Sequence, residues 1–266
     1  MAKKHSKKQA RSSEVPAGMW GGVVATLKFV FKNVRLFLPL LVVALVICGA
    51  AMWVSDDAMV IVVVMAMLVL WLATLFFARR VMAGEKVKFR DGLYNAMTPL
   101  VSSLIVFVVL AVQCIPVMLI VIGYSAAVET NLFANAFYGS LFVLFAILMV
   151  VIAGFLLSGT LMGMIAVNTP GMYPWEALKL SHELMIGRRV EFVLKMLVLL
   201  MLLAVVYVVI VGPAVLVGLM LYNIGGIETP MLVPIVSMAA GCVAVILAGV
   251  YLYIYYRQIL GMKVRI

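Results

Sequence analysis

The sequence predicts an all-α, polytopic membrane protein: a helical bundle of six transmembrane helices, arranged as three hairpins that each follow an amphipathic interfacial helix. Of its 266 residues, 67% are hydrophobic and 11% are charged, whereas soluble domains are about 45–50% apolar and about 25% charged. Six apolar runs are long enough to cross a hydrocarbon core of about 30 Å as helices. On this segmentation, all 20 Lys and Arg residues lie on one side of those runs.

A basic tail, residues 1–16, precedes a single predicted membrane domain over residues 17–266. We expect the tail to be disordered and cytoplasmic. It resembles the start of a signal peptide, but no short apolar segment with a small-residue cleavage site follows it. We therefore expect this tail to stay uncleaved.

The first interfacial helix is predicted from apolar residues at spacings of three and four, which share one helix face. Its cations occupy another face, so the helix should lie along the membrane surface with its positive charges near headgroups. The apolar stripe consists of Trp20, Val23, Leu27, Phe31 and Val34, and the cations are Lys28, Lys32 and Arg35.

The first hairpin then comprises two predicted spans, Leu36–Val54 and Ala58–Phe77. Only Ser55, Asp56 and Asp57 separate the two runs, which predicts a tight turn. Uninterrupted apolar runs favour helices over the alternating pattern of a membrane barrel.

The second interfacial helix is predicted over Val87–Met97, where Phe89, Leu93 and Met97 recur at helical spacing. The spans Leu100–Ile122 and Leu141–Val167 follow it. Pro116 interrupts the backbone hydrogen bonding of the third span, and Pro213 and Pro234 do so in the last two, so we expect local kinks.

The third interfacial helix begins at Pro174, a residue suited to the first helical position, and Glu176 favours the positive end of the helix dipole. Lys179 and Glu183 are four residues apart, which predicts a charge-paired helix surface. Gly187 is a plausible helix stop. The last two spans are predicted at Met196–Leu219 and Leu232–Tyr256.

The charge distribution predicts the orientation, because cytoplasmic loops carry the excess of Lys and Arg. The charged residues of the predicted outer turns are all acidic, namely Asp56, Asp57, Glu129 and Glu228. We therefore expect both termini to be cytoplasmic and the protein to be a multi-pass component of a bacterial inner (plasma) membrane.

A weak internal repeat supports three units, each with one interfacial helix and two spans. Aligning residues 89–93 with 174–178 places Asp91 over Glu176 and Leu93 over Leu178. The two segments share the pattern of acidic and apolar positions more than they share identical residues.

Two segments carry a resemblance to a known group of proteins. The run from Tyr173 to Val190, which leads into an apolar span, is similar to a recurring segment of uncharacterised bacterial integral membrane proteins. These resemble the membrane domain found beside some glycerophosphoryl diester phosphodiesterases. The segment Gly84–Pro99, followed by residues 113–116, looks like the corresponding first half. The resemblance implies six spans with inner amphipathic helices, and it does not imply phosphodiesterase activity, which belongs to a separate soluble barrel.

Within the spans, few polar residues suggest a site. Gln113 could contact a ligand or join a neighbouring helix, and Gly159 with Gly163 permits close helix approach within the chain or in a dimer. No cysteine pair, two-histidine motif, phosphate loop or nucleophile elbow is present, so we predict no cofactor, no metal site and no catalytic residues.

The leading functional hypothesis is a non-enzymatic scaffold or accessory protein whose basic inner face contacts anionic phospholipids or a cytosolic or membrane protein partner. A net charge of +10 also suits nucleic acid, but the cations flank apolar runs, so no specific nucleic-acid partner is expected.

The alternative is a transporter or channel for a neutral or amphipathic solute, with Gln113, Ser158, Thr160 and Tyr207 lining a polar path. The oligomeric state stays open. The predicted headgroup contacts are Lys28, Lys32, Arg35, Arg79, Arg80, Lys179, Arg188 and Arg189.

Overall fold

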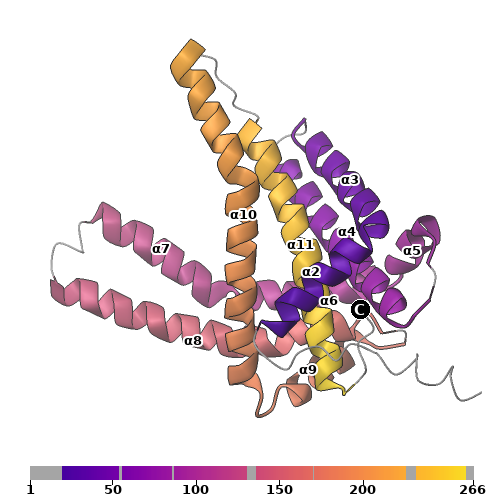
Figure 1. The fold of residues 1–266 in the computed structure, drawn as a ribbon. Coiled ribbons are helices and arrows are strands. Elements are labelled where there is room, and N and C mark those ends of the chain that lie inside the picture. Colours follow the sequence, from indigo (N-terminus) through magenta and orange to yellow (C-terminus); the bar gives the residue numbers. More distant parts are fainter. Residues whose placement is uncertain are drawn as a thin grey trace, which may run out of the picture. The chain divides into compact units, whose positions relative to one another are not determined.

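A computed structural model of the chain describes residues 20–53, 56–85, 87–130, 136–169, 171–225 and 232–261. Within these ranges every regular element is a helix (Figure 1). The predicted tail, residues 1–16, lies outside the described residues. The helices are α2 (Gly21–Lys32), α3 (Val34–Ala51), α4 (Asp56–Met82), α5 (Phe89–Ala96), α6 (Leu100–Gln113), α7 (Ile115–Glu129), α8 (Ala136–Ala166), α9 (Pro174–Leu184), α10 (Arg189–Gly225) and α11 (Leu232–Ile259).

In the described part of the chain, five helices are long and apolar enough to cross a membrane. The number rises to six if α6 and α7 together form one broken span. These features indicate a membrane protein. The five single-helix candidates lie within α3, α4, α8, α10 and α11.

The predicted third span, Leu100–Ile122, is not one straight helix. It is divided into α6 and α7, which meet at Cys114 with a bend of 41°. Pro116 explains the break, because its ring has no N–H for the carbonyl of Val112 and clashes with that carbonyl in a straight helix. Pro213, by contrast, lies inside α10, which continues as a single helix.

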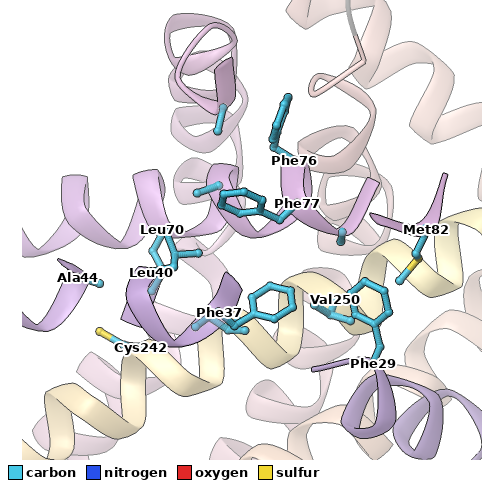
Figure 2. Packing of buried hydrophobic residues seen from close by; sticks show 14 of the residues in the cluster. Phe29, Phe37, Leu40, Ala44, Leu70, Phe76, Phe77, Met82, Cys242 and Val250 are labelled. Atoms are coloured by element: carbon cyan, nitrogen blue, oxygen red, sulfur yellow. The ribbon is translucent and has the colours of Figure 1, made fainter. Parts of the chain in front are cut away.

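The chain divides into two compact units. The first contains Met1–Leu100 and Lys195–Ile266, and the second contains Val101–Leu194. The first unit has an apolar core formed by α2, α3, α4, α5 and α11 (Figure 2). In this core the rings of Phe29 and Phe37 pack edge to face at 6.1 Å, and Phe77 stacks on Phe89 at 6.0 Å.

Helix α11 runs parallel to α4, and glycines allow the two to approach closely. A Cβ atom added at Gly241 would lie 3.6 Å from Met67, and one at Gly249 would lie 3.0 Å from Thr74. Residue numbers therefore rise together along both helices. Helices α3 and α4 are in contact and only residues 52–55 separate them in the sequence, so they run in opposite directions.

These directions bring the start of α3 and the ends of α4 and α11 to the same end of the first unit. Helix α2 joins them there, because Phe29 contacts Phe37 and Gly22 approaches Tyr251. We call this region the basic end. Its cations are Lys28, Lys32, Arg35, Arg79, Arg80 and Arg257.

Each short helix packs on the long helix that ends just before it. Helix α5 follows α4 and contacts it at Phe77, where a Cβ added to Gly92 would clash at 2.4 Å. Helix α9 likewise follows α8 and contacts it, and a Cβ added to Gly163 of α8 would lie 3.3 Å from Leu178 of α9. Helix α2 has no described predecessor, and it packs on α11, the last described helix. The same pairing of a short helix with a long one therefore occurs three times, and the third pair joins the first described helix to the last.

Candidate functional site

Helix α9 is fixed against the end of α8 in the second unit. The backbone N–H of Tyr173 donates to Glu176 Oε2 at 3.4 Å, which caps the helix start beside Pro174. Ala177 and Ser181 are buried on the inner face. A Cβ added at Gly163 would lie 3.2 Å from Ser181 Oγ. The close approach predicted from Gly159 and Gly163 thus occurs within the chain, and α9 is the helix that it admits.

A cavity of about 570 Å³ lies between α6, α8 and α9. This volume falls within the range of roughly 300–1,000 Å³ typical of small-molecule sites. Apolar side chains form most of its wall, and charged and polar groups of α9 lie along one side. The lining residues are Val109, Gln113, Phe155, Leu156, Gly159, Thr160, Trp175, Leu178, Lys179, His182 and Glu183.

A hydrogen bond between α6 and α8 forms part of the cavity wall. The Thr160 hydroxyl donates to Gln113 Oε1. Gln113 is the last residue of α6, so this bond lies directly beside the break before α7. Gln113 therefore joins two helices, one of the two roles that the sequence left open, and it also lines the cavity, while its contact with a ligand stays a prediction.

Arg189, at the start of α10, holds one side of the cavity in place. Its guanidinium carbon lies 3.7 Å from the centre of the Phe155 ring, a cation–π contact, and its Nη2 lies 3.1 Å from His182 Nε2. A guanidinium only donates, so Arg189 is the donor of a hydrogen bond between these two nitrogens. Nδ1 faces Gly159, another residue of the cavity wall.

Lys179 and Glu183 both line the cavity and are exposed, but they do not pair with each other. Their spacing favours an ion pair, yet no ion pair joins these two described residues, whereas Arg80 pairs with Glu85. The predicted charge pairing on α9 is therefore wrong for these two residues. Each leaves its charge available at the cavity.

The eight predicted headgroup contacts fall into two groups. Five of them belong to the basic end of the first unit, where Arg79 and Arg80 lie 5.6 and 5.5 Å from the Phe76 ring centre. Three lie in the second unit: Lys179 lines the cavity, Arg189 contacts Phe155 and His182, and Arg188 is exposed. Their contact with lipid stays a prediction.

Two of the four residues proposed to line a transporter path meet within the second unit. Gln113 and Thr160 meet at the cavity, but the Ser158 hydroxyl is buried and donates to the Phe155 carbonyl at 2.8 Å. Tyr207 belongs to the first unit, where its hydroxyl donates to Ser237 Oγ at 3.3 Å.

The sequence analysis did not predict that His182 and Glu183 line a cavity together. One sequence feature could have indicated it: the small residues Gly159 and Gly163 form a helix face against which another helix can lie closely. Among the described residues, no group of three His, Cys, Asp or Glu side chains could hold a metal ion.

Comparison with known proteins gives no match: no family model, no curated protein and no solved structure matches the chain. The resemblance to the membrane domain beside glycerophosphoryl diester phosphodiesterases therefore stays a prediction.

Proposed function

We propose that the protein is a non-enzymatic membrane scaffold or accessory protein whose basic end binds anionic phospholipid headgroups. One observation carries the proposal: cations from four separate helices, α2, α3, α4 and α11, gather at one end of the first unit. Lys28, Lys32 and Arg35 are exposed there, and Arg80 pairs with Glu85. Each suitably placed cation contributes about 1 kcal/mol to the attraction of anionic lipid.

The exposed aromatic residues of the short helices support an interfacial position for α2, α5 and α9. Trp20, Tyr94 and Trp175 are 63%, 81% and 79% exposed, respectively. Trp and Tyr are enriched where membrane meets water, because one part of each ring system is apolar and another forms hydrogen bonds. In this arrangement the helices lie along the headgroup region and the long helices cross the bilayer.

The proposed topology has six spans in three hairpins, with α6 and α7 as one broken span. The repeated pairing of a short helix with a long one supports the three-unit repeat, since Gly92 and Ala177, which are equivalent in that alignment, are both buried on their respective long helices. The excess of cations at the basic end supports the proposal that this end faces the cytoplasm at a bacterial inner membrane, because cytoplasmic loops carry the excess of Lys and Arg. Both termini are then cytoplasmic.

The headgroup contact is tested by electron paramagnetic resonance of spin-labelled lipids at the surface of the reconstituted full chain. We expect spin-labelled phosphatidylglycerol to associate more strongly than spin-labelled phosphatidylcholine. The triple variant Lys28→Gln, Lys32→Gln, Arg35→Gln should lose most of this preference. Changing Lys28 and Lys32 to Arg keeps the charge and should preserve it. The proposal would be refuted if the unaltered chain, the triple Gln variant and the Arg variant all showed the same lipid preference. Selective capture of one cytosolic protein would instead favour a protein partner.

A second candidate function is the passage of a neutral or amphipathic solute. The observation that favours it is the broken span, because interrupted helices beside polar side chains often mark transport sites. Here the break adjoins Gln113, Thr160 and the cavity. Solute flux into vesicles that falls in Gln113→Leu, with unchanged insertion, would support this function.

A further inference from the structure

The cavity of the second unit combines two unpaired charges of opposite sign with an apolar wall. Lys179 and Glu183 lie one turn apart on α9, so they occupy the same face of that helix. Neither has an ion-pair partner in the described part of the chain. A ligand with only negative charge would neutralise Lys179 and be repelled by Glu183. A ligand that carries both charges satisfies both side chains.

The remaining wall indicates that the rest of the ligand is apolar. Val109, Phe155 and Leu156 line the cavity on α6 and α8. A polar metabolite would lose hydration against these side chains without compensation, whereas a hydrocarbon chain would bury apolar surface. The wall and the charged side together suit an amphiphile.

A third group is oriented for the anionic part of such a ligand. His182 lines the cavity, and its Nε2 lies 3.1 Å from Arg189 Nη2, so Nδ1, which lies beside Gly159, is the ring nitrogen left for a ligand. Phe155 holds the guanidinium from its other side. Arg189 therefore acts as a positioning residue that fixes the orientation of His182.

We propose that this cavity binds one phospholipid with a zwitterionic headgroup that contains a phosphate and a primary ammonium. The phosphate contacts Lys179 and His182, and the ammonium contacts Glu183. One acyl chain lies along Val109, Phe155 and Leu156. The site lies wholly within the second unit, so this inference does not depend on the anionic-lipid contacts of the basic end.

The test is native mass spectrometry of the delipidated full chain carrying Lys28→Gln, Lys32→Gln and Arg35→Gln, which reduces competing phosphatidylglycerol binding at the basic end. This protein is titrated separately with phosphatidylethanolamine and phosphatidylglycerol of the same acyl composition. We expect one phosphatidylethanolamine to bind more tightly than phosphatidylglycerol. Glu183→Gln should weaken phosphatidylethanolamine binding roughly tenfold, as expected for the loss of a charged hydrogen bond, without weakening phosphatidylglycerol binding. Lys179→Gln should weaken the binding of both lipids.

Glu129→Gln is the matched control, because Glu129 is an exposed carboxylate of the same unit outside the cavity. It should leave both affinities unchanged. Gly159→Leu, which fills the cavity beside His182, should prevent tight phosphatidylethanolamine binding. The proposal is overturned if phosphatidylglycerol binds as tightly as phosphatidylethanolamine, or if Glu183→Gln has no effect or weakens both lipids equally. None of these outcomes bears on the basic end, whose lipid preference is tested separately with the Lys28, Lys32 and Arg35 variants and spin-labelled lipids.

Discussion

The Thr160 hydroxyl donates a hydrogen bond to Gln113 Oε1, and this bond joins α8 to the last residue of α6. It lies beside the point where the apolar run turns by 41°. The two residues are far apart in the sequence, so the bond fixes the position of the break relative to α8. It also places both polar groups in the wall of the cavity.

Removing this bond should destabilise the second unit. Interhelical hydrogen bonds in membranes contribute about 0.6 kcal/mol on average and up to about 1.7 kcal/mol. We expect Gln113→Leu and Thr160→Val each to lower the free energy of unfolding, with a coupling energy in this range for the double variant. Unfolding in mixed micelles measures it, and strictly additive effects would show that the two side chains do not interact.

Replacing Pro116 by alanine should straighten the broken span. The change restores an N–H group for the Val112 carbonyl and removes the clash of the ring. With a bend of 41° and a rise of 1.5 Å per residue, the distance between labels at Ser102 and Ser125 should increase by about 2 Å. Pulsed electron resonance measures this distance in a background whose native cysteines are alanine. An unchanged distance would mean that other contacts impose the bend.

Gly163→Leu should displace α9, because even the added Cβ would lie 3.2 Å from Ser181 Oγ and 3.3 Å from Leu178. Overpacking of this kind costs about 1–3 kcal/mol, which should lower the midpoint of thermal unfolding. Gly154→Leu is the matched control, since nothing lies within 4 Å of a Cβ added there. Similar losses in both variants would contradict the close packing of α8 and α9.

Phe155→Leu should weaken the hold on Arg189 while keeping an apolar side chain. A cation–π contact contributes about 0.5–2 kcal/mol, depending on its exposure to water. We expect a loss of stability in this range and a change in the NMR chemical shifts of His182, whose Nε2 contacts the same guanidinium. In a protein that already carries Arg189→Gln, the contact is absent, so Phe155→Leu should lower stability by less than it does in the unaltered chain. An equal loss of stability in both backgrounds would contradict the contact between Phe155 and Arg189.

The positions of the helices were largely predictable from local signals. Pro174 starts α9 as expected, and Gly187 adopts a positive φ of 74° three residues after that helix ends. These features depend on the backbone preferences of single residues, which the sequence shows directly. The all-helical fold and the apolar helices long enough to cross a membrane follow in the same way from long apolar runs.

The site was much less predictable, because it depends on contacts between distant residues. Pro116 indicated a kink, but its local chemistry did not show that Gln113 would meet Thr160. Lys179 and Glu183 have the spacing of an ion pair, and the structure leaves them separate. Side-chain orientation decides such contacts, and orientation depends on how α9 lies on α8.

The lipid preference of the basic end is tested most directly by fluorescence quenching of Trp20, which directly precedes the helix that carries Lys28 and Lys32. In a variant with the other three tryptophans changed to phenylalanine, brominated phosphatidylglycerol should quench Trp20 more strongly than brominated phosphatidylcholine at equal mole fraction. High salt should reduce the difference, because it screens charges exposed to water. Equal quenching by the two lipids at low salt would contradict the proposed binding of anionic headgroups.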